Sequence, residues 1–434
     1  MSGWKRAVAV PFTGQRDGEG PMTWGQRHIW RLTEWLDDGD PYFNMAWTLA
    51  VPGRPGLDRV LGALRALLER HESLRTTWEG RTQRITRSGT LTVDLYEAGD
   101  RRPLALAKEL AEELAAKGFR YDSELPMRCA LVLADGQPRA AAFAFTHMAV
   151  DAWSLDVIAS EWRPLIAGEQ LSAPACQPLD LTGLERDCDR ELRYWRSHLE
   201  RVPQRLVDRE IEPEEPRYVR IGMESAAAGV AARAIARRCS VSTTSVLGTA
   251  CATVMADALG RRTAVMQWIV ANRHQERTRS MVGTMTQDGL FVLDLPDAPD
   301  QGFPAAVRAG HRQALAAYRH ACYDPYAMRA LRDDCERARG GPIDLSAYFN
   351  DGRIVADWPN LPDGDLTELA AKTRTFFVGA WPHVDGTVFF ATGQATHTCQ
   401  LYLLVDTAHL PRETAYAMLA GVEQLLIKNA VKEP

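Results

Sequence analysis

The sequence has 434 residues, of which 46% are hydrophobic and 25% are charged, a composition typical of globular proteins that excludes the fibrous and disordered classes. Its 51 Lys and Arg residues against 56 Asp and Glu give a formal net charge of -5, without long runs of one sign, so no nucleic-acid-binding surface is predicted. The length exceeds that of one comfortable core and predicts two large lobes.

The cysteines and the apolar runs bear on the cellular compartment. The 8 cysteines include no CxxC pair and no zinc-ligand spacing, which predicts reduced thiols and no metal site. The N-terminal segment carries charges instead of a long apolar stretch, and no later apolar run reaches the roughly 20 residues that span a bilayer. We therefore expect a cytoplasmic monomer that binds neither membrane, metal nor nucleic acid.

The predicted elements of the N-terminal part alternate between helices and strands. Apolar residues recur at helical spacing in the helices, and the last two strands meet at an Asp-Gly turn typical of a β-hairpin. The predicted helices are 57–68, 104–117 and 154–166, the last capped by Ser154, and the predicted strands are 74–78, 129–134 and 140–146. His147 therefore follows a strand and precedes a helix, where a side chain can be held firmly and still face a cleft.

A Pro-containing stretch at 173–178 marks the predicted boundary between an N-terminal lobe of residues 1–178 and a C-terminal lobe of residues 179–434. The second lobe also alternates between the two kinds of element. Its predicted helices are 225–238, 243–258, 303–320 and 411–429, and its predicted strands are 264–271, 289–295, 343–349, 375–381, 387–392 and 399–405. The fold class predicted for the chain is α/β with mixed sheets.

The segment from Thr146 to Ala152, THMAVDA, has the clearest chemical potential. A neutral imidazole at His147 can accept a proton from a nucleophile that attacks a thioester at neutral pH. Backbone N–H groups at the start of the next helix would stabilise the developing oxyanion. A His and an Asp at this spacing also occur where a buried histidine is merely satisfied by its neighbours, so the segment alone leaves both interpretations open.

Three further segments accompany this one in a fixed order. They are WGQRHIW from Trp24 to Trp30, RHESLRTTW from Arg70 to Trp78, and VANR ending at Arg273, which is followed by Met281-Val282-Gly283. With THMAVDA they resemble the AQxRLW, RHExLRTxF and HHxxxDG motifs, and the segment before the IGxFVNT motif, of nonribosomal peptide synthetase condensation domains in the chloramphenicol acetyltransferase-like superfamily. The resemblance spans nearly the whole chain and weakens toward the C-terminus.

The resemblance implies two chloramphenicol-acetyltransferase-like lobes arranged in a V, with a tunnel at their interface. It implies a stand-alone acyltransferase that forms an amide, or less often an ester, between a nucleophile and an acyl or aminoacyl thioester on a carrier protein supplied in trans. His147 matches the residue on which family members rely, and Asp151 matches a structural aspartate that is expected to pair with Arg273. The chain itself would bind no cofactor, because the phosphopantetheine belongs to the partner carrier protein.

Two departures from the family motif keep alternatives open. Thr146 replaces the first histidine, although its hydroxyl can still donate a hydrogen bond, and Ala152 replaces a glycine, which requires a negative φ. A catalytically inactive module that recruits a partner enzyme or carrier protein is therefore the main alternative. A coenzyme A-dependent acyltransferase and an epimerase-like role are further alternatives.

Four more side chains are candidates for lining the tunnel. They are Gln26, Trp153, Gln287, which stands about where the family has an asparagine, and His397. Trp153 also fits the core at the start of a buried helix, and His397, like His383, also fits a surface loop. The segments Tyr323–Tyr326 and Tyr348–Asn350 are interpreted as packing.

Overall fold

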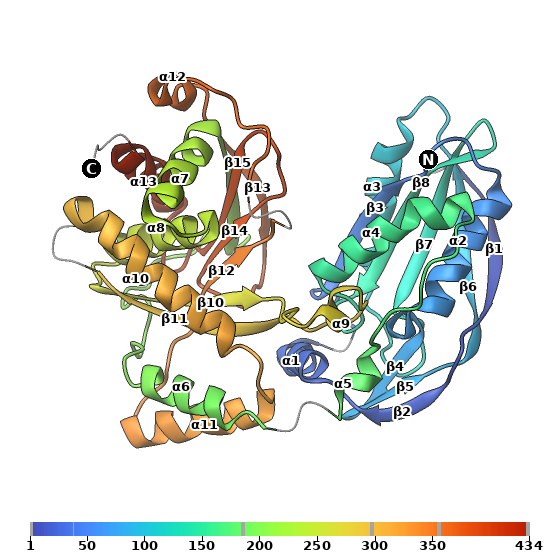
Figure 1. The fold of residues 1–434 in the computed structure, drawn as a ribbon, viewed down its shortest axis with the longest axis horizontal. Coiled ribbons are helices and arrows are strands. Elements are labelled where there is room, and N and C mark those ends of the chain that lie inside the picture. The colour runs from blue at the N-terminus through green and yellow to red at the C-terminus, as the bar shows by residue number, and fades with distance from the viewer. Residues whose placement is uncertain (1–2, 38, 184–186, 296–298, 354–356, 431–434) are drawn as a thin grey trace. The chain divides into compact units, whose positions relative to one another are not determined.

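The computed structural model describes residues 3–37, 39–183, 187–295, 299–353 and 357–430 (Figure 1). The chain forms two compact units. The N-terminal unit comprises Met1–Asp187, Ala271–Thr286 and Asp324–Tyr326, and the C-terminal unit comprises Cys188–Val270, Gln287–Tyr323 and Ala327–Pro434. Two short segments from late in the sequence thus pack with the N-terminal unit. The sequence analysis placed a single boundary at residue 178 between two continuous lobes, whereas these units are each made of several segments. The boundary at residue 178 therefore stays a prediction.

The N-terminal unit contains a five-stranded mixed sheet and a three-stranded sheet. The strands of the larger sheet are, in spatial order, β1 (Trp4–Thr13), β6 (Ser88–Glu97), β7 (Met127–Ala134), β8 (Gln137–Thr146) and β3 (Asn44–Ala50). Within it β6 and β7 run parallel, and the other neighbours run antiparallel. The smaller sheet has the order β2 (Gly18–Pro21), β5 (Thr82–Ile85) and β4 (Thr76–Glu79).

The hairpin of β7 and β8 confirms its sequence prediction and places His147. The turn residues Asp135 and Gly136 have φ angles of 54° and 70°, as a two-residue hairpin of matching twist requires. From Ala140 to Thr146 β8 is buried, because helices cover the sheet on both faces. Four of these residues are alanines, whose small side chains let the helices approach closely. His147 then follows directly at the end of a rigid central strand.

Helices cover both faces of the larger sheet. Both α2 (Leu57–Arg70) and α4 (Ala152–Ala167) pack on one face, and α3 (Pro103–Ala115) packs on the other. The other helical elements of this unit are α1 (Trp24–Thr33), the 3-10 turn η1 (Glu72–Arg75), α5 (Pro178–Leu181) and α9 (Glu276–Arg279). The predicted helices at 57–68 and 104–117 are confirmed, and the extended segment predicted from residue 74 begins only at Thr76, after η1.

The cap of α4 corrects one prediction. The residue that caps this helix is Asp151, whose side chain accepts a hydrogen bond of 2.8 Å from the backbone N–H of Ser154. Ser154 lies inside the first turn, so the prediction that it is the cap was wrong. An acceptor side chain three residues before an unpaired N–H has the geometry of a cap, and the aspartate occupies that position.

The C-terminal unit is built on a seven-stranded sheet. Its strands are, in spatial order, β11 (Gln287–Asp294), β10 (Thr263–Val270), β12 (Ala347–Asp351), β14 (Val388–Thr392), β15 (Cys399–Asp406), β9 (Tyr218–Ser225) and β13 (Arg374–Trp381). The main core joins this sheet to α7 (Ala226–Cys239), α8 (Thr243–Ala258), α10 (Pro299–Arg319) and α13 (Arg412–Ala430). The remaining helices are α6 (Asp189–Leu199), α11 (Pro325–Arg339) and α12 (Leu366–Ala370). All the helices and strands predicted for this part of the chain are present within a few residues of their expected ends.

No single helix in the described ranges is long and apolar enough to cross a membrane. The pair α7 and α8, which is bent by 109°, has enough length and apolar character only when the two helices are taken together. Most of α8 is buried in the core of the C-terminal unit, which accounts for its apolar character.

Candidate active site

The loop that carries His147 is held by hydrogen bonds from several directions. The backbone N–H of His147 donates to the carbonyl of Phe43 at 2.9 Å, and the N–H of Ala149 donates to the carbonyl of Thr146 at 3.0 Å. The hydroxyl of Ser73 donates to the carbonyl of Ala149 at 2.6 Å. Because Phe43 and Ser73 come from distant parts of the sequence, the loop is fixed by the tertiary structure and not by its own turn alone.

The imidazole of His147 is oriented by one backbone carbonyl. Its Nδ1 lies 2.8 Å from the carbonyl oxygen of Val150. Since a carbonyl can only accept, Nδ1 carries the proton in this arrangement, and the neutral ring has its lone pair on Nε2. Burial lowers the pKa of His147, although Asp151 and the hydrogen bond to Val150 oppose that effect. The ring is partly exposed and is in the base form at neutral pH.

Thr146 supports the loop from the position where the family motif has its first histidine. Its hydroxyl accepts a hydrogen bond of 3.3 Å from the N–H of Met148. The same hydroxyl lies within hydrogen-bonding reach of the Tyr121 phenol, whose pKa is raised by burial and lowered to a smaller degree by Thr146. The threonine therefore makes local contacts to the loop, and the sequence analysis did not identify Tyr121 as its neighbour.

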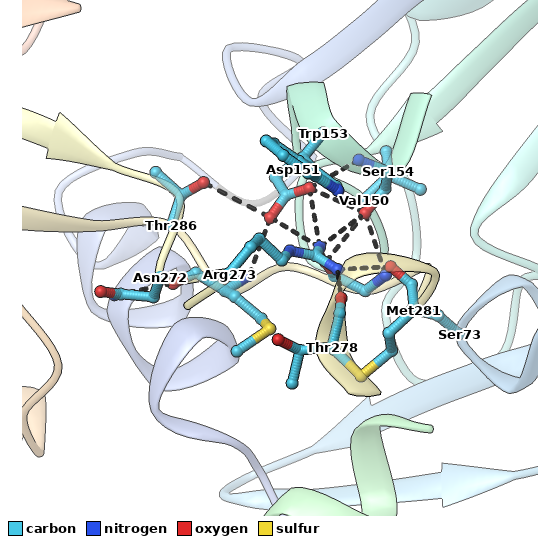
Figure 2. A network of polar contacts seen from close by, with 12 residues as sticks. Ser73, Val150, Asp151, Trp153, Ser154, Asn272, Arg273, Thr278, Met281 and Thr286 are labelled. Atoms are coloured by element: carbon cyan, nitrogen blue, oxygen red, sulfur yellow. Dashed lines mark hydrogen bonds and ion pairs between the residues drawn. The ribbon is translucent and has the colours of Figure 1, made fainter. Parts of the chain in front are cut away.

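Asp151 and Arg273 form a buried ion pair beneath the loop (Figure 2). One guanidinium nitrogen, Nη2, lies 3.0 and 3.1 Å from the two carboxylate oxygens, and the side chains are 1% and 2% exposed. Burial alone would raise the pKa of Asp151, but the charge of Arg273 and the hydrogen bonds from Met285 and Ser154 outweigh it and hold that pKa below its ordinary value. The aspartate is thus ionised, and its oxygens are used within the protein.

Arg273 also organises the segment of residues 271–286 (Figure 2). Its Nη1 donates to the carbonyls of Thr278, at 2.8 Å, and Met281, and its Nη2 donates to the carbonyl of Gly283 at 2.6 Å. The N–H of Met285 returns to the Asp151 carboxylate at 3.0 Å. The segment therefore wraps around one guanidinium and is tied to the His147 loop by the ion pair.

The first turn of α4 makes further contacts to the same segment. The Ser154 hydroxyl donates to the Asp151 carboxylate at 2.7 Å and accepts from the N–H of Gly283 at 3.0 Å. The half-buried Trp153 donates from Nε1 to the carbonyl of Arg279 at 2.9 Å. Trp153 thus holds segment 271–286 instead of lying in a core.

Two expectations about the start of this helix have different outcomes. The N–H of Ser154 is used by the cap and that of Leu155 donates to the Asp151 carbonyl, so these two groups are not the expected oxyanion donors. Ala152 has the negative φ that an alanine at this position requires. Among the described residues other than glycine, those with positive φ are Asp135, Ser240 and Asn272. Alanine can therefore replace the glycine of the family motif without strain.

The other candidates for lining a tunnel are divided between the two units, with Gln26 in the N-terminal unit and Gln287 and His397 in the C-terminal unit. Gln26 is 0% exposed, accepts from the N–H of Thr23 at 2.9 Å to cap α1, and donates to Gln83 at 3.1 Å. Gln287 is 1% exposed and donates to the carbonyl of Tyr323 at 2.8 Å. Both amides are occupied by hydrogen bonds inside their own unit, and their assignment to a channel stays a prediction. His397 is exposed within the C-terminal unit.

The packing interpretation of the two tyrosine-containing segments agrees with their contacts. The Tyr323 hydroxyl donates to the carbonyl of Asp288 at 3.1 Å, and the Tyr348 ring meets that of Phe389 edge to face at 5.6 Å. Among the residues that the structure describes, no group of three or more His, Cys, Asp or Glu side chains could hold a metal ion.

A family model of condensation domains matches residues 17–346, so the chain belongs to the condensation domain family. A linear gramicidin synthase protein of Brevibacillus parabrevis is 28% identical over 215 residues, which are 45% of this chain and 4% of that protein. The probable non-canonical nonribosomal peptide synthetase CymA of Salinispora arenicola (strain CNS-205) is 25% identical over 327 residues, which are 69% of this chain and 4% of that protein. The chain thus spans only a few per cent of the length of these curated relatives.

Solved structures show the same fold. The condensation domain that mediates chain release from the enacyloxin polyketide synthase has a TM-score of 0.75 at 20% identity, over 98% of this chain and 85% of that one. The X-domain from teicoplanin biosynthesis has a TM-score of 0.70 at 18% identity, over 96% of both chains. In its complex with OxyB, the X-domain has a TM-score of 0.67 at 18% identity, over 96% of this chain and 94% of that one. The fold is the chloramphenicol-acetyltransferase-like fold of these domains, and the V arrangement and the tunnel stay predictions.

Proposed function

We propose that this protein is a condensation-type acyltransferase. It would join an acyl or aminoacyl group, delivered as a thioester on a carrier protein, to an amine, or less often to a hydroxyl. The observation that carries the proposal is the orientation of His147, whose Nδ1 is held by the Val150 carbonyl so that the lone pair is on Nε2. Members of this family act with carrier-bound substrates in peptide synthetase systems, which supports the choice of donor.

The chemistry requires one base that later acts as an acid. The amine nitrogen attacks the thioester carbonyl and forms the C–N bond, while its proton passes to Nε2 of His147. The C–S bond then breaks, and the thiolate leaves with the proton that the imidazole returns. Because burial lowers the pKa of His147, the ring is neutral before the attack and can begin the cycle at neutral pH.

The protein's other residues would act through position. The Asp151–Arg273 pair holds the loop and segment 271–286, and Thr146 supports the loop through Met148. The thioester would arrive on the phosphopantetheine arm of the carrier protein, which supplies the activated acyl group. The sulfur is the one atom of the arm that would take part in the proton transfers.

The test compares wild type and His147→Ala with an acyl-loaded carrier protein and a panel of amines, with product measured by intact mass. We expect the substitution to lower the rate by roughly 10²- to 10⁴-fold, the usual effect of losing a general base. His383→Ala is the matched control, because His383 is exposed in the C-terminal unit and should leave the rate unchanged. Equal product from His147→Ala and wild type would remove this histidine from the mechanism.

A second candidate function is recruitment without catalysis. Thr146 and Ala152 depart from the family motif, and one structural neighbour, the X-domain, has been solved in complex with OxyB. In this case the protein would bind a loaded carrier protein and bring a partner enzyme to it. Carrier binding in a titration, with no product from any donor and amine, would favour recruitment over acyl transfer.

A further inference from the structure

A series of aromatic rings leads to His147 within the N-terminal unit. The ring centroids of Trp35 and Tyr42 lie 5.4 Å apart, those of Tyr42 and Phe43 lie 4.8 Å apart, and those of Phe43 and His147 lie 6.3 Å apart. Each pair meets edge to face, with interplanar angles of 70°, 90° and 62°. We call Trp35, Tyr42 and Phe43 the aromatic wall.

The aromatic wall runs from the surface to the reactive ring. Trp35 is 45% exposed, and Tyr42 and Phe43 are half-buried, as His147 is. Tyr42 and Phe43 bury most of their area but keep some of it accessible, so the three rings and His147 form a continuous row that reaches the surface at Trp35.

The position of the aromatic wall relative to His147 is fixed by the backbone. The carbonyl of Phe43 accepts the N–H of His147 at 2.9 Å, so the backbones of the two residues are held side by side, and their ring centroids lie 6.3 Å apart. Phe43 directly precedes β3, which pairs with β8 from Asn44 opposite Thr146. A group that binds at the imidazole of His147 is therefore close to the ring of Phe43.

We propose that the aromatic wall is a substrate subsite that receives an aromatic ring carried by one of the two molecules joined at His147. The inference rests on the proposed acyl transfer, since that reaction is what brings a substrate to this histidine. Aromatic rings are preferred over saturated ones of equal size, because ring edges and faces attract each other at centroid distances of about 4.5–7 Å beyond the effect of buried area. The ring can belong to the amine or to the acyl group. The two cases are separated by whether aromatic amines or aromatic thioesters bind more tightly than their saturated partners.

The experiment uses two matched pairs of probes and does not require turnover. The amine pair is 2-phenylethylamine and 2-cyclohexylethylamine, and the donor pair is the benzoyl and cyclohexanecarbonyl thioesters of N-acetylcysteamine. Dissociation constants for the full chain are measured by ligand-observed NMR titration. We expect wild type to bind the aromatic member of one pair about two- to tenfold more tightly than its saturated partner. A preference in the amine pair assigns the aromatic wall to the nucleophile, and a preference in the thioester pair assigns it to the acyl group.

Two variants and one control connect the preference to the aromatic wall. Trp35→Ala removes a ring that is 45% exposed, and Phe43→Leu keeps an apolar side chain of similar size, so both should fold. Both are expected to abolish or reduce the preference for the aromatic probe. Trp4→Ala removes another exposed tryptophan of the same unit, 54% exposed on β1, and should retain the preference.

The outcomes separate this inference from the proposed function. Equal binding of the members of both pairs by wild type, or a preference retained in both aromatic-wall variants, would overturn the subsite. Such a result would leave acyl transfer intact if His147-dependent product still forms. Conversely, a Trp35-dependent preference without any product would support the subsite and count against catalysis.

Discussion

Each unit of the protein buries an aspartate with an arginine, and the two pairs differ in what they connect. Asp151 and Arg273 are 122 residues apart, whereas Asp351 and Arg353 are 2 residues apart. Arg273 uses its other donors on backbone carbonyls of segment 271–286. Arg353 instead lies 4.3 Å from the ring centre of Trp358, in the same part of the chain.

The second pair is surrounded by hydroxyl groups from other elements of the C-terminal unit. The Asp351 carboxylate accepts from the hydroxyl of Thr244 in the first turn of α8, and from that of Thr392, each at 2.6 Å. Burial would raise the pKa of Asp351, but the hydrogen bonds and charge of Arg353 and the two hydroxyls hold it below its ordinary value. The same chemistry therefore closes a core in one unit and holds the His147 loop in the other. The two pairs differ in what they hold, which is the His147 loop and segment 271–286 in one unit, and α8 and β14 in the other.

The largest expected effect is on stability and should be shared by both pairs. Arg273→Met and Arg353→Met each leave a buried carboxylate without its partner, so each should lower the free energy of unfolding by about 3–5 kcal/mol in denaturant titrations. Arg329→Met removes an exposed partner of Asp333 and should change stability little. If the free energy of unfolding fell by well under 1 kcal/mol in either buried variant, the carboxylate of that pair would not depend on its arginine as described.

The second prediction concerns the pKa of His147, which should depend on Asp151 and not on Asp351. Because the charge of Asp151 raises the pKa of His147 against the larger effect of burial, Asp151→Asn should lower that pKa further. Protonated His147 cannot accept a proton, so we expect activity to fall as the pH drops through this pKa. In wild type the midpoint of the acidic limb of kcat/KM should therefore lie below 6.5, the ordinary pKa of histidine. The limb should move to lower pH in Asp151→Asn and stay in place in Asp351→Asn. NMR titration of the histidine signals checks the same shift, and an equal shift in both variants would contradict it.

The smallest effect concerns single hydrogen bonds of indole groups. Trp153→Phe removes the bond to the Arg279 carbonyl and should cost about 0.5–1.5 kcal/mol, with faster amide hydrogen exchange confined to segment 271–286. Trp195→Phe removes a bond of the same type, of 3.1 Å, to the His320 carbonyl in the C-terminal unit. That variant should leave exchange in segment 271–286 unchanged. Unchanged exchange in Trp153→Phe would mean that the contacts of Arg273, Asp151 and Ser154 hold the segment without this bond.

Much of the fold was predictable where local patterns decide it. The hairpin of β7 and β8 followed from an Asp-Gly turn between two apolar runs, and α2 followed from apolar residues at helical spacing. By contrast, β1 and β6 were not predicted. β1 keeps most of its residues exposed at the edge of the sheet and lacks a clear alternation, whereas β6 alternates buried Leu91, Val93 and Leu95 with more exposed residues and was missed despite that pattern.

The candidate site was predictable in its residues and in one of its contacts, the pair of Asp151 and Arg273. The order of the motifs indicated His147, Asp151 and Arg273, and the structure brings the last two together. The resemblance also assigned Gln26 and Gln287 to a channel, whereas both amides are buried in hydrogen bonds. A motif specifies which residue types recur, but not whether an amide is used by its own backbone or by a substrate.

The sequence by itself determined the family, the strand, loop and helix around His147, and the residues that flank it, because these depend on short patterns and on motif order. Only the tertiary structure decided where the proton of His147 lies, which rings stand beside it, and that segment 271–286 packs with the N-terminal unit. The physical reason is distance along the chain. The N–H of Met285 meets Asp151 across 134 residues, and no local spacing rule reaches that far.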